Sequence, residues 1–125
     1  MITFEQIKNN ETIRTYIQKA DESLSALGFT EHSFAHVGMV AETSKYILQT
    51  LDYPARTIEL VQIAAWLHDI GNLVNRTDHS QSGAVMAFRI LGEMGMEPEE
   101  IGEIVTAIGT MTRARACPSA PWRQR

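Results

Sequence analysis

The spacing of apolar residues constrains this 125-residue chain most strongly, because they recur every three or four positions rather than every two. The clearest stripe begins after Asn10, which can cap a helix, and stops at Gly28, which can end one. Its apolar members are Ile13, Tyr16, Ile17, Ala20 and Leu24. The sequence shows no β-hairpin signal and no internal repeat. The helical spacing of the apolar residues therefore predicts an all-α fold.

Capping residues, glycines and prolines divide the rest of the sequence into further helices. We expect these helices to begin near Thr3, at Thr30 or Ser33, near Ala55, at Asp78 and at Pro98. The helix from about Ala55 to Ile70 is expected to stop at Gly71, with a short loop, "NLVNRT", after it. Its middle, "IELVQIAAWLHDI", is apolar on most sides, which is typical of a central helix. The sequence therefore predicts a single-domain helical bundle of about six helices packed around this one.

The composition excludes several classes of protein. A hydrophobic fraction of 44% and a charged fraction of 21% are ordinary for a folded domain with one core. The net charge of −4 argues against DNA as a partner. The single cysteine, Cys117, rules out a disulfide within the chain and fits a reducing compartment. No apolar run approaches the length of a membrane span, and the first residues do not resemble a secretory signal, so we expect a cytoplasmic protein with no membrane partner.

The stretch "AAWLHDIGN" places His68 and Asp69 side by side at the end of the most apolar helix. Polar groups at such a position need a partner, and a metal ion is one candidate. Imidazole and carboxylate together suit Fe, Mn, Co, Ni or Zn better than Ca or Mg. The alternative is that Asp69 pairs locally and His68 only packs, and the dipeptide alone does not decide between the two interpretations.

Three further histidines lie in helical segments. His36 is on a mostly apolar helix, where it is either a core residue or a metal ligand. His32 lies four residues earlier and therefore on the same face of that helix. His79 begins a helix beside Asp78, where it is either a solvated first-turn residue or a ligand. The arrangement of the histidines, more than any one of them, carries the prediction of a site.

Three stretches together resemble the HD-domain superfamily of metal-dependent phosphohydrolases: "HVGMVA" from His36, "AAWLHDIGN", and "HSQSGA" from His79. The resemblance covers roughly Ser33 to Gly109. It implies a bundle of five or more helices with the site between them. It also implies that a small phosphorylated substrate, such as a nucleotide, is hydrolysed by a metal-activated water.

The resemblance implies a role for each matching residue. His36, His68 and Asp69 would bind a divalent transition metal ion, and His79 would contribute to a second ion, so that the centre holds one or two. His68 and Asp69 would be the catalytic residues, with Asp69 also orienting the water. His32, Asn72 and Arg76 could touch phosphate, or they are ordinary polar residues. The alternative function is a non-catalytic helical module of the same fold that binds a nucleotide or a partner protein.

The sequence departs from the family pattern after "EIVTAIG". Many members of the family have a His-Asp or His-x pair there, and a later aspartate on a further helix. The stretch "TMTRARACPSAPWRQR" contains neither histidine nor acid, so we divide the chain into an HD-type domain, 1–109, and an irregular basic tail, 110–125. One choice of codons for this tail, read after insertion of one base, gives NHDEGTGVPVSAVAAA. We therefore hypothesise a frameshift at Thr110. It would remove C-terminal helices, impair the site, and expose apolar surface that favours a homo-oligomer.

Overall fold

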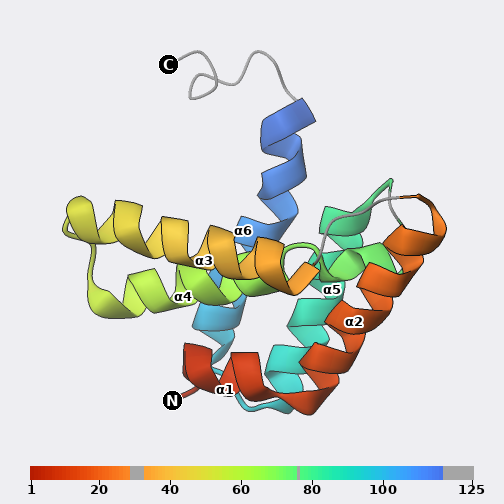
Figure 1. Cartoon of the computed structure of the whole chain (residues 1–125). Helices are drawn as coiled ribbons and strands as arrows, with labels where there is room; N and C mark the ends of the chain where they lie inside the picture. Colours follow the sequence, from red (N-terminus) through yellow and green to blue (C-terminus); the bar gives the residue numbers. More distant parts are fainter. Residues whose placement is uncertain (29–32, 76, 117–125) are drawn as a thin grey trace.

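The computed structural model describes residues 1–28, 33–75 and 77–116, and within them it contains α-helices, one 3₁₀-helix and no strand. The elements are α1 (Phe4–Asn9), α2 (Glu11–Ala26), α3 (Ser33–Thr50), α4 (Ala55–Leu67), η1 (Ile70–Leu73), α5 (His79–Glu93) and α6 (Pro98–Ala116). Helices α3 and α4 form an antiparallel pair, α5 packs on α6, and α2 packs on η1 (Figure 1). The all-α prediction is confirmed.

Capping residues begin the first two helices as the sequence predicts. The Thr3 side chain accepts a hydrogen bond from the Gln6 backbone, and the Gln6 side chain accepts one from the Thr3 backbone, which completes a capping box. The Asn10 side chain accepts from the backbone N–H of Ile13 at 3.0 Å. Helix α2 is followed by Gly28 at a φ of 91°, a conformation that glycine adopts without strain. These local signals explain why the predicted helix starts are accurate here.

Helix α4 is the central helix, as its apolar sequence predicts. It contacts α1, α3 and α6, and Ile63, Ala64, Ala65 and Leu67 are almost fully buried. The other large, fully buried side chains come from the surrounding elements: Ile7, Ile13, Val37, Ile70, Leu91, Ile104 and Ile108. Because the helix is covered on several sides, residues that follow it directly are held in a fixed place. Within the described ranges, no helix combines the length and the apolar character that crossing a membrane requires.

The end of helix α4 differs from the sequence prediction. Helix α4 ends at Leu67 rather than at Ile70, and a 3₁₀ turn from Ile70 to Leu73 replaces the beginning of the predicted loop. The Asn72 side chain donates to the carbonyl of Asp69 at 3.0 Å, and this contact stabilises the tighter turn. At the start of α5, Asp78 takes the N-cap position but its side chain makes no capping hydrogen bond.

The end of α6 also differs from the prediction. The helix continues to Ala116, so residues 110–116 are helical, although the sequence was interpreted as an irregular tail from residue 110 onward. The reason is local: "TMTRARA" contains no glycine or proline, and alanine, arginine and methionine favour helix. The rest of the predicted tail, 117–125, lies outside the described residues.

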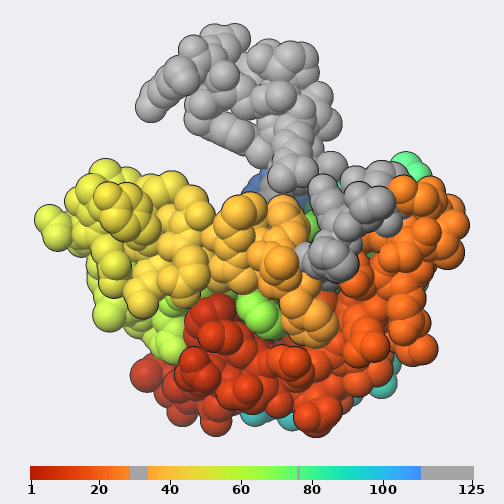
Figure 2. Space-filling view, in the orientation of Figure 1, coloured from red at the N-terminus to blue at the C-terminus, as the bar shows by residue number. Residues whose placement is uncertain are grey.

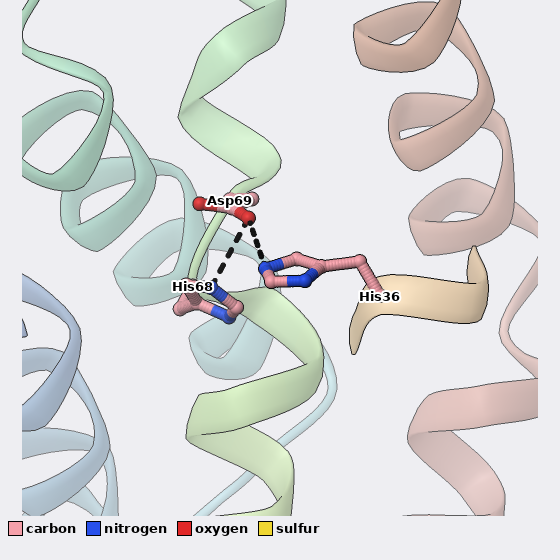
Figure 3. Close-up of side chains that lie close together, drawn as sticks. All are labelled: His36, His68 and Asp69. Carbon is pink, nitrogen blue, oxygen red and sulfur yellow. Dashed lines mark ion pairs between the residues drawn. The ribbon is translucent and has the colours of Figure 1, made fainter. Parts of the chain in front are cut away.

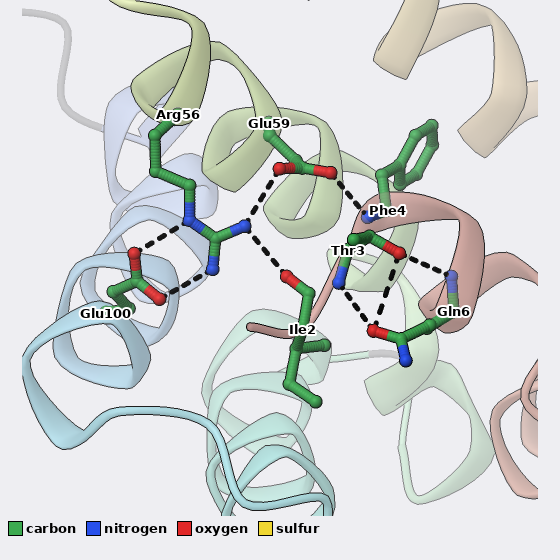
Figure 4. Close-up of polar contacts among 7 residues, drawn as sticks. All are labelled: Ile2, Thr3, Phe4, Gln6, Arg56, Glu59 and Glu100. Carbon is green, nitrogen blue, oxygen red and sulfur yellow. Dashed lines mark hydrogen bonds and ion pairs between the residues drawn. The ribbon is translucent and has the colours of Figure 1, made fainter.

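One arginine joins three parts of the chain that are distant in sequence (Figure 4). The Arg56 guanidinium on α4 donates to both carboxylate oxygens of Glu100 on α6, at 2.8 and 2.6 Å. It also donates to Glu59 at 2.8 Å and to the carbonyl of Ile2 at 2.7 Å. Glu59 in turn accepts from the backbone N–H of Phe4 at 2.9 Å. This junction fixes both the N-terminal segment and α6 to α4.

Candidate metal centre

Four polar side chains from three helices and one connection meet at the end of α4. His36 lies on α3, His68 is the C-cap residue of α4, Asp69 precedes η1, and His79 is the first residue of α5. Figure 3 shows the rings of His36 and His68 directed at the Asp69 carboxylate. The structure therefore brings together the residues that the sequence analysis singled out from three separate stretches.

The Asp69 carboxylate is the centre of these four side chains, which we call the metal-centre cluster. Its Oδ2 lies 3.1 Å from Nε2 of His36 and 3.1 Å from Nε2 of His68. Its Oδ1 lies 3.2 Å from Nε2 of His79. One ligand atom from each of His36, His68 and Asp69 lies within 4.8 Å of the others, which is the spacing of a group able to hold one ion. His79 is outside that group of three and approaches the carboxylate from its other oxygen.

The end of the helix explains how two neighbouring residues can face the same point. Within an α-helix, adjacent side chains diverge by about 100° around the axis. Here the helix ends at Leu67, and Asp69 has left the helical conformation, with a φ of −103° and a ψ of 5°. The carboxylate can therefore turn back toward the imidazole of His68.

Hydrogen bonding orients the His68 ring. Its Nδ1 lies 2.5 Å from the carbonyl oxygen of Ala65, one turn earlier on α4. Because a carbonyl only accepts, Nδ1 carries the proton and donates it. Nε2 is then the nitrogen that faces the Asp69 carboxylate, at 3.1 Å. One ring nitrogen that donates to a backbone carbonyl, with the other ring nitrogen directed into the site, is the usual arrangement of a metal-binding histidine.

Two opposing effects act on the pKa of Asp69. Burial raises the pKa of this carboxyl because it disfavours the charged form. The hydrogen bond from His68 and the charges of His68, His36 and His79 lower the pKa, and together they bring it below its ordinary value. Asp69 is therefore ionised near neutral pH, which is the protonation state that a metal ligand needs.

The cluster is open to solvent on one side. His68 is only 6% exposed, whereas the side chains of His36 and Asp69 are 28% and 22% exposed. A ligand could therefore approach the carboxylate past His36 while His68 remains fixed from behind. The donor set of two imidazoles and one carboxylate fits a divalent transition metal ion, because such ions accept nitrogen and oxygen ligands together.

The sequence also suggested three polar residues near the site: His32, Asn72 and Arg76. His32 and Arg76 lie outside the described residues. Asn72 is buried, and its amide donates to the Asp69 carbonyl, so it supports the turn that carries the carboxylate. The contact of His68 with the Ala65 carbonyl was not predicted from the sequence, although Ala65 lies three residues before His68, one turn earlier on the helix. A pocket of about 400 Å³ between α2, η1 and α5 shares no lining residue with the metal-centre cluster.

Comparison with protein families identifies the HD domain over residues 33–116, which is more than half of the chain. The chain therefore belongs to the HD-domain family, and the resemblance found in the sequence is confirmed. This family is part of a superfamily of metal-dependent phosphohydrolases, whose substrates are phosphorylated. Comparisons with curated proteins and with solved structures find no match.

Proposed function

We propose that this protein is a metal-dependent phosphohydrolase that hydrolyses a phosphate ester, such as a nucleotide. The observation that carries the proposal is the convergence of three imidazole nitrogens on the carboxylate of Asp69. An ionised carboxylate surrounded by histidines contributes little to a hydrophobic core. The same side chains are suitable ligands for a metal ion. The membership of the HD-domain family supports the same conclusion independently of the geometry.

Each residue has a proposed part in this function. His36, His68 and Asp69 would hold the first ion, because their ligand atoms are close enough to share it. His79 would contribute to a second ion from the Oδ1 side of the same carboxylate. A bound metal ion of this kind activates water and polarises the phosphoryl oxygen. His68 keeps its orientation through Ala65, and Asp69 orients the water with its ionised carboxylate.

The bonds and protons of the hydrolysis balance without any further reactant. The water oxygen forms a new bond to phosphorus while the bond from phosphorus to the ester oxygen breaks. The leaving oxygen takes a proton, and the water loses one. The partial exposure of Asp69 and His36 leaves the side from which substrate would approach open.

A hydrolysis screen tests this proposal. Protein purified without chelator and supplied with Mn²⁺ is assayed against p-nitrophenyl phosphate and a set of nucleoside monophosphates. We expect phosphate release by the unchanged chain and its loss in Asp69→Asn, because the amide neither carries the charge nor binds the ion comparably. Asp52→Asn is the matched control, since Asp52 is an exposed turn residue with a φ of 60°, a conformation that asparagine tolerates.

The screen also separates the two candidate functions. Phosphate release that depends on Asp69 supports the enzyme. Metal binding without phosphate release from any of these substrates would instead favour the non-catalytic module of the same fold, or an enzyme whose site is impaired by the sequence after Gly109. Absence of both metal binding and hydrolysis would contradict the proposal.

We also propose that the protein forms a homo-oligomer. Helix α3, coloured yellow to orange, lies at the surface of the molecule (Figure 2). Large apolar side chains of α3 and of the turn after it are exposed, among them Tyr46 at 72%. Met39, Ile47 and Leu51 are also largely exposed. An exposed group of large apolar side chains on one helix favours association, because burial removes their surface from water.

A further inference from the structure

A close backbone contact between two elements lies directly beside the metal-centre cluster. Gly71, in the 3₁₀ turn η1, packs with its backbone against the first turns of α5. A Cβ atom added to Gly71 would lie 1.8 Å from the carbonyl oxygen of His79 and 2.5 Å from the backbone nitrogen of Gly83. Real Cβ atoms do not approach other atoms so closely, so only glycine fits at this position.

The contact involves the residue whose side chain reaches Asp69. The backbone of His79 touches Gly71, and the imidazole of the same residue lies 3.2 Å from Asp69 Oδ1. The approach of η1 to α5 therefore determines how far His79 can reach. The other two histidines come from other elements, because His36 lies on α3 and His68 at the end of α4.

The size of the expected displacement can be read from the same contact. Ordinary van der Waals contact begins at about 3.4 Å, so an added methyl group at 1.8 Å requires a shift of roughly 1.6 Å. The atoms in the way are backbone atoms, which cannot swing aside like the end of a side chain. The first turn of α5 would move away from η1 and carry the His79 ring away from Asp69.

We infer that Gly71 is a positioning residue that determines whether the centre takes up a second metal ion through His79. This inference rests on the proposed function, because it assumes that the cluster binds metal. It goes beyond that function by assigning the second ion's affinity to a backbone contact rather than to a ligand. The first ion, held by His36, His68 and Asp69, should bind in either case.

A Mn²⁺ titration tests the inference. Chelator-treated protein is titrated by calorimetry, and the loaded protein is examined by electron paramagnetic resonance for the exchange coupling of two ions that share a carboxylate. In Gly71→Ala we expect the second ion's affinity to fall about 10- to 100-fold, with the first ion's affinity retained and the coupling lost. His79→Ala should give the same pattern, because it removes the ligand that Gly71 positions.

Two further variants serve as controls. Gly92→Ala changes a glycine on the same helix where an added Cβ meets nothing within 4 Å, and it should leave both affinities unchanged. If Gly71→Ala does not fold, Gly83→Ala provides the test. Its Cβ would lie 3.3 Å from the Gly71 nitrogen, so it should weaken the second ion in the same direction by a smaller amount.

The measurements distinguish a failure of this inference from a failure of the proposed function. The inference is overturned if folded Gly71→Ala keeps the second ion's affinity and the coupling, or if it weakens both ions equally. It is also overturned if the unchanged chain binds a single ion whose affinity is the same in His79→Ala. If the unchanged chain binds no Mn²⁺ at all, the proposed function itself fails.

Discussion

At the scale of single residues, the sequence predicted the metal-centre cluster but not the way its members face one another. The stretch "AAWLHDIGN" showed that His68 and Asp69 follow an apolar helix, and the resemblance to the HD-domain superfamily implied that His36 and His79 belong to the same site. Periodicity could not predict that Asp69 offers one oxygen to His36 and His68 and the other to His79. That division depends on where the helix ends, which a sequence places only within a few residues.

The residue that should be most sensitive to substitution is His68. We expect His68→Ala to lose bound metal, because the variant lacks one of the ligands that face Asp69. The fold should be largely kept, with a loss of about 1–3 kcal/mol in the free energy of unfolding from the hydrogen bond to Ala65 and the lost packing. Elemental analysis and thermal unfolding measure the two effects separately. Unchanged metal content in this variant would show that the ligand assignment is wrong.

At the scale of elements, local signals predicted the helices, whereas contacts between them were beyond the sequence. Thr3, Asn10 and Gly28 act within a few residues of themselves, so their effects could be predicted. The contact of Gly71 with His79 and the junction at Arg56 join residues that are distant in sequence or lie on different elements. Gly71 was interpreted only as a helix stop, because spacing carries no information about how closely two backbones approach.

The Arg56 junction gives a prediction about stability in acid. The hydrogen bond and charge of Arg56 lower the pKa of Glu100 below its ordinary value of 4.5 in the folded protein. A group whose pKa is lowered by folding stabilises the fold above its ordinary pKa and loses that contribution as the pH falls through the lower, folded value. The unchanged chain should therefore lose stability below about pH 4.5 more steeply than Glu100→Gln.

Unfolding by urea at several acidic pH values measures this difference. The control is Glu103→Gln, which removes an exposed carboxylate from the same helix and should leave the pH dependence close to that of the unchanged chain. At neutral pH, Glu100→Gln should be less stable than Glu103→Gln, because Arg56 loses its bidentate partner. Parallel pH profiles for the unchanged chain and Glu100→Gln would contradict the assignment.

At the scale of the whole molecule, the central helix connects the fold to the function. Because α4 is covered by α1, α3 and α6, its end is held rigidly, and the site is built where it stops. The apolar sequence of this helix was sufficient to predict its central place. The end of α6 was not predicted, since composition alone suggested an irregular tail where the helix continues to Ala116.

We propose above that His36, His68 and Asp69 bind one metal ion together. The most direct measurement is X-ray diffraction from crystals of the unchanged chain grown with Mn²⁺, recorded at a wavelength where manganese scatters anomalously. We expect an anomalous peak within bonding distance of Nε2 of His36, Nε2 of His68 and a carboxylate oxygen of Asp69. Anomalous peaks located only elsewhere on the protein, with these side chains still paired to one another, would contradict it.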